Sequence, residues 1–357
     1  MQAWPMTAPG PTCMFRIDAD RLRPLLHARL RALDVDPAGA GHLVDSLLQT
    51  SLRGVDSHGI QLFPHYVRAV AAGRVCARPQ PELARTAAST ARLNADHAFG
   101  HHAGAVAIDA AVEIAREAGL GAVSVRDSTH FGAAAYFALR AADAGMIGFS
   151  FTNADALVKA FNAREPVFGT NPLCFAAPLR DEGPLCLDMA TSLVSWNKVR
   201  NSRESGTALG GDWAFDRAGQ PTTDAAAAVS LNPAGGYKGY GLGMMVEVLC
   251  GLLADGPVAR ELLGMYTAPI EARRHLGHFF LALDIERFVP ADRFRSRLQG
   301  LVDAIRALEP VQASVMVPGD PEKRAAVERT RDGIPAPQAL LDAFAEAGVP
   351  LGGALRS

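Results

Sequence analysis

Apolar side chains recur every three or four positions in the first 75 residues, which is the spacing of helices that bury one face. One such stripe begins after Asp18, a second begins after Asp36, and a third ends at Gly73. Asp at a helix start caps free backbone N–H groups, and Gly after the last turn ends a helix. The pattern therefore predicts a helical lobe over residues 16–75, preceded by a flexible tail at residues 1–15.

From residue 76 the pattern changes to short apolar runs that alternate with helical stretches. Residues 121–126 and 146–151 read as strands, and residues 133–144 between them read as a helix. A strand, a helix and a second strand at this spacing form a βαβ unit, which predicts a parallel pair with a right-handed crossover. We therefore expect an α/β domain over residues 76–289, with the helical lobe completed by residues 290–357.

Four later stretches complete the predicted pattern. Residues 200–236 are polar and Gly-rich with little periodicity, and they predict a long surface excursion near the site. A strongly apolar helix is expected from about Leu242 to Leu253. An amphipathic helix is expected over residues 290–308, and a strand that runs into a turn over residues 315–320.

Composition narrows the class of protein. Hydrophobic residues make up 49% and charged residues 20% of the 357 positions, enough to bury a substantial core. The formal net charge is only −2 and no basic block is present, which argues against nucleic acid as a partner. Five scattered cysteines without a Cys-x-x-Cys pair suit a reducing cytoplasm. We see no signal-peptide pattern and no apolar run of membrane-spanning length, so we expect a cytoplasmic protein without a membrane partner.

The densest group of reactive side chains lies between residues 53 and 59. Arg53 offers an anion clamp, Ser57 a hydroxyl, His58 a titratable imidazole and Asp56 a carboxylate able to orient it. These are the parts of a general acid/base site. The alternative is that Arg53 and Asp56 form a surface ion pair beside an ordinary loop histidine.

Polar residues also follow the predicted strands. His130 comes just after one strand and before a helix, the usual place for ligands on open α/β sheets, and Asp155 follows the next strand. Asp188 ends a further strand, where a carboxylate can orient an imidazole or hold a ribose hydroxyl. The alternatives are a structural or helix-capping role for His130 and an N-cap role for Asp188.

A glycine-rich turn at residues 235–241 precedes the strongly apolar helix and carries Lys238. Glycines before a helix let backbone N–H groups approach an anion, and a lysine adds positive charge. This favours contact with a phosphate or a cofactor, although a close-packed turn would also need glycine. The sequence has no G-x-G-x-x-G after a strand, no Walker loop, no G-x-S-x-G and no His-Glu-x-x-His. His97 and His101 have helical metal-ligand spacing, but no carboxylate or cysteine nearby in the sequence completes a set, so we predict no metal site.

Six short motifs occur in a characteristic order: Asp56-Ser-His-Gly59, Ser128-Thr-His-Phe-Gly132, Gly169-Thr-Asn-Pro172, Asp188-Met-Ala-Thr-Ser192, Lys238-Gly-Tyr-Gly-Leu242 and Pro318-Gly-Asp320. Together they resemble the malate/L-lactate dehydrogenase-type family of NAD(P)-dependent oxidoreductases. That group includes ureidoglycolate, sulfolactate and diketogulonate enzymes. The family is unrelated to the Rossmann lactate dehydrogenases, so the resemblance accounts for the missing glycine fingerprint.

The resemblance implies an α/β fold around a mixed sheet, a homodimer with sites near the interface, and a role for each matching residue. His58 would be the acid/base residue, with Asp188 a proposed catalytic partner. Ser57, Tyr66 and Asp155 would contact the substrate. The cofactor, NAD or NADP, would be bordered by His130, Asp188, Met189, Ala190, Thr191, Ser192, Tyr237, Lys238, Gly319 and Asp320.

One departure concerns the substrate. Family members that bind a substrate carboxylate usually carry Arg four residues after the histidine, and this chain has Leu62 there. The candidates to replace that clamp are Arg53, His65, Lys159 and Arg164. The choice between NAD and NADP stays open, and the candidates to meet a 2′-phosphate are Lys198, Arg200 and Arg203.

We therefore expect hydride transfer between nicotinamide and a 2-hydroxy acid, with the 2-oxo acid as the oxidised partner. The alternative enzyme reduces a cyclic imino acid, whose C=N bond replaces the carbonyl. From other classes, the chain could be a cofactor-binding protein that has lost catalysis, or a metal-dependent hydrolase built on His97 and His101.

Overall fold

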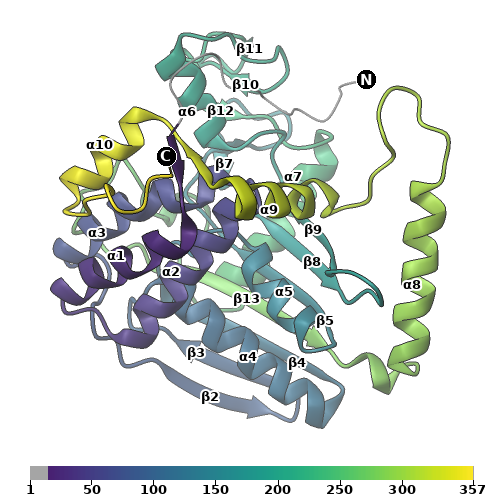
Figure 1. The fold of residues 1–357 in the computed structure, drawn as a ribbon. Coiled ribbons are helices and arrows are strands. Elements are labelled where there is room, and N and C mark those ends of the chain that lie inside the picture. The colour runs from purple at the N-terminus through teal and green to yellow at the C-terminus, as the bar shows by residue number, and fades with distance from the viewer. Residues whose placement is uncertain (1–14, 357) are drawn as a thin grey trace.

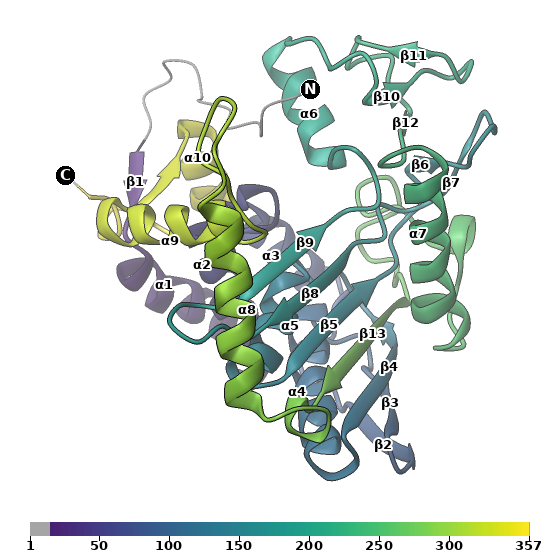
Figure 2. The same cartoon turned by 90° about the vertical axis from the view of Figure 1, so that its right-hand side faces the viewer.

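The computed structural model describes residues 15–356, so the predicted tail lies outside the described residues except for Phe15. At the centre is a mixed seven-stranded sheet, which Figure 2 shows along its strand order. In that order the strands are β2 (Glu82–Ala87), β3 (Thr90–Asn94), β4 (Leu120–Ser128), β13 (Leu276–Leu283), β5 (Ile147–Thr152), β8 (Leu173–Ala177) and β9 (Leu185–Met189). The α/β class and the mixed sheet are confirmed.

The predicted parallel pairing of the strands around residues 121–126 and 146–151 is wrong. β13 lies between β4 and β5 and pairs antiparallel with both, so these two strands run parallel without touching. The parallel pair with a crossover helix is instead β3 and β4. Local patterning could not reveal a strand that comes from more than 120 residues further along the chain.

Helices cover both faces of this sheet (Figures 1 and 2). α4 (Gly100–Ala118) and α5 (Ala135–Asp143) bury alanine-rich faces against one side, together with Phe131, Phe137 and Phe280. α7 (Tyr237–Glu247) and the π-helical turn η3 (Val248–Leu252) cover the other side. α7 begins five residues before the predicted start at Leu242, because glycine at its N-terminus lets the chain turn tightly into the helix.

A helical lobe packs beside the sheet at the end where α2 meets α4 (Figure 1). It contains α1 (Ala19–Ala32), α2 (Pro37–Leu52), α3 (Phe63–Ala71) and α10 (Gln338–Glu346). A two-stranded sheet of β1 (Phe15–Ile17) and β14 (Ile334–Ala336) ties the two chain ends together. Of the stretch 290–357, residues from about 334 join this core. α8 (Ala291–Arg306) packs elsewhere, against Leu179 and Val317.

Two predicted irregular stretches are ordered differently. No strand forms over residues 315–320, and α9 (Asp320–Asp332) begins there instead. The expected excursion at residues 200–236 is partly structured, because α6 (Trp196–Ser205) packs on a small five-stranded sheet. In order this sheet contains β11 (Pro221–Thr222), β10 (Ala214–Phe215), β12 (Ser230–Leu231), β6 (Val158–Lys159) and β7 (Pro166–Phe168).

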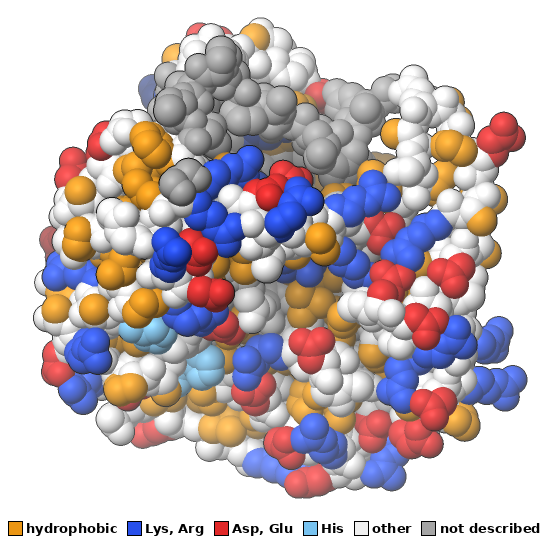
Figure 3. Space-filling model, viewed as in Figure 1, with side chains coloured by type: hydrophobic (Ala, Val, Ile, Leu, Met, Phe, Trp, Pro, Cys, Tyr) orange, Lys and Arg blue, Asp and Glu red, His pale blue; other side chains and the backbone are white. Residues whose placement is uncertain are grey.

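Charged side chains of both signs are spread over the face seen in Figure 3, with basic ones gathered over α9. Within residues 15–356, no helix is both long and apolar enough to cross a membrane. The four cysteines at described positions, Cys76, Cys174, Cys186 and Cys250, are free thiols.

Candidate active site

The turn that carries His58 is formed by the end of α2 and a short 3₁₀ helix, Asp56–His58. The hydroxyl of Ser57 and Nδ1 of His58 lie 2.8 Å apart and share a hydrogen bond. Gly59 permits the tight return of the chain, since a Cβ there would lie 2.0 Å from Oγ of Ser51. That same Ser51 oxygen accepts the N–H of Ile60 at 2.8 Å. The imidazole is therefore held by its own local turn.

Asp56 does not orient His58, contrary to our interpretation of the segment, and it does not pair with Arg53. Both carboxylate oxygens accept hydrogen bonds from Arg329 of α9, at 2.5 and 2.9 Å. Arg329 also donates to the backbone oxygen of Ser51 at 2.7 Å. From the other side, the side-chain amide of Asn197 donates to the backbone oxygen of Ser57 at 2.9 Å. Residues remote in sequence thus fix the turn from two sides.

His130 lies against His58, with ring centroids 5.7 Å apart and the planes 25° from parallel. The buried hydroxyl of Tyr66 lies 2.7 Å from Nδ1 of His130. Burial lowers the pKa of His58 to about 4 and the pKa of His130 well below its ordinary value. Burial also raises the pKa of Tyr66, so that its hydroxyl keeps the proton. The pair of imidazoles is neutral at pH 7.

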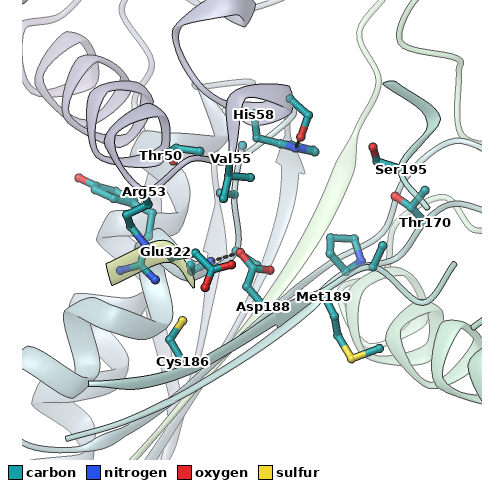
Figure 4. Close-up of a pocket in the computed structure, with 18 of the residues that line it drawn as sticks. Thr50, Arg53, Val55, His58, Thr170, Cys186, Asp188, Met189, Ser195 and Glu322 are labelled. Carbon is teal, nitrogen blue, oxygen red and sulfur yellow. Dashed lines mark hydrogen bonds between the residues drawn. The ribbon is translucent and has the colours of Figure 1, made fainter. Parts of the chain in front are cut away.

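A cavity of about 490 Å³ opens beside this turn. Figure 4 shows His58 and Asp188 facing this cavity, with Arg53 and Glu322 together on one side and Thr170 and Ser195 across from them. The remaining lining comes mainly from small side chains of residues 132–135 and 189–195. The cavity therefore joins the histidine turn to the end of β9.

Asp188 occupies the wall of this cavity at the end of β9. Its Oδ2 accepts the N–H of Ala135, at the start of α5, at 2.9 Å. The surrounding protein disfavours the charged form and raises the pKa of Asp188 to about 6, although the side chain stays open to the cavity. Arg53 lowers this pKa and Glu322 raises it. Asp188 therefore changes charge near neutral pH.

The segment after Asp188 also faces the cavity. Met189, Ala190 and Ser192 line it, whereas Thr191 turns inward and donates its hydroxyl to the backbone oxygen of Thr170 at 2.9 Å. Gly239 brings α7 against this segment, because a Cβ there would lie 2.7 Å from the backbone oxygen of Thr191. Ala234, just before α7, completes the wall.

Several predicted site residues do not line this cavity. Tyr237 and Lys238 are exposed at the start of α7. Asp155 forms a largely buried ion pair with Arg274 at 2.5 Å. Asp320 is buried, and both its oxygens accept from Arg306. Gly319, beside Asp320, packs on Cys186, which does line the cavity.

The site also contains residues that sequence reasoning did not select. Glu322 and Ser195 line the cavity, and Arg329 and Asn197 hold the histidine turn. Glu322 comes two positions after the Pro-Gly-Asp motif, which is the only local signal for it. The other contacts join segments 140 or more residues apart, and no pattern along the chain marks them.

Leu62 lies in the protein core and is not among the residues that line the cavity. Its side chain is 6% exposed and belongs to the core of the helical lobe. Of the four suggested replacements, only Arg53 lines the cavity. The ammonium group of Lys159 lies 3.6 Å above the ring of Phe215, and Arg164 packs against Gly219.

Residues 17–345 match the family model described as malate/L-lactate dehydrogenase. A malate dehydrogenase of Pyrococcus abyssi is 36% identical over 301 residues, 82% of this chain and 82% of that protein. An Escherichia coli ureidoglycolate dehydrogenase (NAD(+)) is 33% identical, covering 88% and 91%. A (2R)-3-sulfolactate dehydrogenase (NADP(+)) of Chromohalobacter salexigens is also 33% identical, covering 88% and 92%.

Solved structures agree with these relatives. The crystal structure of malate dehydrogenase from Entamoeba histolytica superposes with a TM-score of 0.89 at 28% identity, covering 95% of this chain and 99% of that one. A Δ1-piperideine-2-carboxylate reductase from Pseudomonas syringae superposes with a TM-score of 0.84 at 28% identity, covering 93% and 99%.

Proposed function

This chain belongs to the malate/L-lactate dehydrogenase family, and from that premise we propose which of its residues carry out the reaction and on what substrate. Members of this family are NAD(P)-dependent oxidoreductases, and so is this protein. The reaction is hydride transfer between nicotinamide and C2 of a 2-hydroxy acid, with a 2-oxo acid as the oxidised partner. Our assignment rests on one observation. His58 and Asp188 come from distant segments of the chain, and both line the same cavity.

The cavity suits a nicotinamide cofactor in its donor set and its shape. The hydroxyls of Thr170 and Ser195 are donors for phosphate and ribose oxygens, and Glu322 and Asp188 are acceptors for ribose hydroxyls. Small side chains along residues 132–135 leave room for a flat ring. The bound cofactor supplies or accepts the hydride, and the protein supplies position and proton transfer. Lys238 and Tyr237 would reach a longer cofactor from the start of α7, beyond the cavity itself.

His58 is the residue that exchanges the substrate proton. Its Nδ1 is taken by the hydroxyl of Ser57, which leaves Nε2 for the substrate oxygen. With a pKa of about 4 the ring is neutral at pH 7, the form that accepts the hydroxyl proton during oxidation. In the reverse direction an anionic substrate beside the ring would raise this pKa and favour the protonated donor.

The substrate carboxylate is held by Arg53. It is the arginine of the cavity wall, and a guanidinium can bind a carboxylate through two parallel hydrogen bonds. Arg53 is the residue that ends α2, and it lies five residues before His58 in the sequence. It therefore takes the place of the arginine that is missing at Leu62.

Reduction of a cyclic imino acid is the second candidate. Its support is the likeness to the structure titled Δ1-piperideine-2-carboxylate reductase and the absence of an arginine at Leu62. A cyclic imino acid needs the same acid/base residue, His58, which would protonate the substrate nitrogen instead of an oxygen. Both substrate classes carry a carboxylate for Arg53.

A homodimer is part of the proposal. Apolar side chains follow one stripe along α7 and η3, and Met244, Val248 and Leu252 are 50%, 45% and 63% exposed. An exposed apolar stripe of this length is typical of a subunit interface. Ala234, three residues before this helix begins, lines the cavity, so an interface here would lie next to the site. The free thiols agree with a reducing compartment, and we place the enzyme in the cytoplasm.

The test is oxidation of NADH and NADPH, followed by absorbance, with a panel of 2-oxo acids and cyclic imines. Wild-type protein should turn over 2-oxo acids, and His58→Ala should lose roughly 100-fold or more in kcat. His27→Ala, which changes a histidine on α1, is the matched control and should keep full rate. Turnover of imines alone would establish the second candidate. Full rate in His58→Ala at saturating substrate would refute the assignment.

A further inference from the structure

A second group of reactive side chains lies outside the cavity. His97 is in the turn between β3 and α4, Asp127 is near the end of β4, and His275 comes just before β13. Each offers one ligand atom, and the three atoms lie within 4.8 Å of one another. The three segments come together because β13 pairs with β4 and because the N–H of His97 donates to the backbone oxygen of Asp127 at 2.7 Å.

His97 carries the observation that points to a ligand. Its side chain is 8% exposed, and Nδ1 is buried without a hydrogen-bond partner. A buried polar nitrogen left without a partner costs free energy, so native proteins rarely keep one. By contrast, Asp127 and His275 are already aligned, with Oδ1 and Nδ1 2.6 Å apart. His97 therefore has a buried nitrogen that nothing in the described chain satisfies, and it belongs to a group whose other two members already contact each other.

We propose that His97, Asp127 and His275 bind one divalent transition-metal ion of the zinc type. Two imidazoles and one carboxylate are a common ligand set for such ions, and water fills the remaining position. Ligand atoms around tetrahedral zinc are about 3.4 Å apart, so the atoms of Asp127 and His275, now 2.6 Å apart, must separate, and any pair near the 4.8 Å limit of this group must approach. The side chain of His275 is 46% exposed, which gives the ion a path from solvent.

The surrounding charges determine which ion fits. Asp127 supplies one negative charge, while Arg126 lies 3.7 Å from it and Arg273 lies near His97. These arginines oppose a cation that binds through charge alone. Nitrogen ligands therefore provide the affinity, which favours zinc over magnesium.

A metal ion bound here would connect the turn before α4 to β4 and to the start of β13. Asp127 is also three residues from His130, so the ion would brace the loop that carries the second imidazole of the site. We expect a structural role for the ion, since none of its three ligands lines the catalytic cavity.

The experiment uses full-length protein stripped with a chelator, dialysed, and then titrated with zinc chloride or magnesium chloride. Metal content after gel filtration and thermal unfolding are the measurements, so the result does not depend on dehydrogenase activity. Wild-type protein should retain one zinc per chain and its melting temperature should rise by ~5 °C, with no effect of magnesium. His275→Ala and Asp127→Asn should lose both effects, and because the His275 side chain is 46% exposed and outside the core, its variant should keep the fold.

The control variants are His27→Ala and His42→Ala. His42 is informative because its Nδ1 lies 2.9 Å from that of His102, a second place where zinc could bind adventitiously. Retention of zinc in His42→Ala and loss in His275→Ala is the expected result. The proposal is overturned if wild-type protein retains no zinc, if His275→Ala and Asp127→Asn bind it as well as wild type, or if binding is lost only in His42→Ala.

Discussion

Arg329 gives the sharpest test of how remote residues hold the turn that carries His58. It makes three hydrogen bonds to this turn, two to the carboxylate of Asp56 and one to the backbone oxygen of Ser51. Replacement by methionine keeps most of the apolar stem and removes all three. Among the described residues, Arg329 is the side chain that hydrogen-bonds to the Asp56 carboxylate.

The expected cost can be worked from exposure. Hydrogen bonds to charged groups contribute about 1.5–3 kcal/mol each when buried, but exposed ion pairs contribute only about 0.2–1 kcal/mol. The Arg329 side chain is 15% exposed and that of Asp56 is 47% exposed, so this pair lies between these limits. We expect a loss of about 1–2 kcal/mol of unfolding free energy, equivalent to a fall in melting temperature of roughly 1–3 °C for a chain of this length. If the same free energy is lost in positioning His58, kcat/KM falls by about 10-fold.

The assay is thermal unfolding together with the kinetics of cofactor oxidation. The matched control is Arg331→Met on the same helix, whose side chain is 73% exposed and pairs with its neighbour Asp332. Asp56→Asn and the double variant complete a cycle, in which the two substitutions should be clearly non-additive. The reasoning is refuted if Arg329→Met keeps the kcat/KM of wild type and melts at the temperature of Arg331→Met.

Three further predictions concern titration and substrate binding. Burial raises the pKa of Asp188 to about 6, and we propose that its anion stabilises protonated His58 across the cavity that both line, so hydroxy-acid oxidation should speed up as pH rises through 6. Asp188→Asn should remove this inflection from the kcat/KM profile, and an unchanged profile would contradict the role. Arg53→Met should raise the KM for carboxylate substrates by about 10-fold or more, and an unchanged KM would exclude Arg53 as the clamp. His101 has a pKa of about 3 in the folded chain and about 6.5 unfolded, so its stability contribution is complete above pH 6.5 and is lost as pH falls toward 3. His101→Leu should therefore lose less melting temperature than wild type between pH 7.5 and pH 5, and equal losses would show that other groups dominate.

The sequence predicts those elements whose burial is periodic. The stripe of leucines on α1 and the alanine-rich inward face of α4 are buried as their spacing indicates. α9 escaped prediction because its sequence is mostly charged and its few apolar residues do not form a stripe. It is held in place by ion pairs to distant residues, such as Arg329 to Asp56, and such pairs leave no mark on local periodicity.

The candidate site also has a part that the sequence predicts and a part that it does not. The motifs locate His58 and Asp188, because the chemistry requires those side chains at fixed places in short segments. They do not reveal what surrounds them. Asp56, two residues before His58, accepts hydrogen bonds from Arg329, which lies 273 positions further along the chain. Asp155 forms an ion pair with Arg274. Which carboxylate orients a histidine and which one only braces the fold is decided by tertiary contacts.

The insertion of β13 between β4 and β5 has a consequence for biosynthesis. The ribosome releases β4 and β5 well before residues 276–283, so the facing edges of these strands have no partner while more than 120 residues are still to be made. Unpaired edges in the middle of a sheet favour association with other chains, and contacts of such long sequence separation form slowly. These edges stay open to such association until β13 has been made, and a chain that stops before residue 276 cannot close its central sheet.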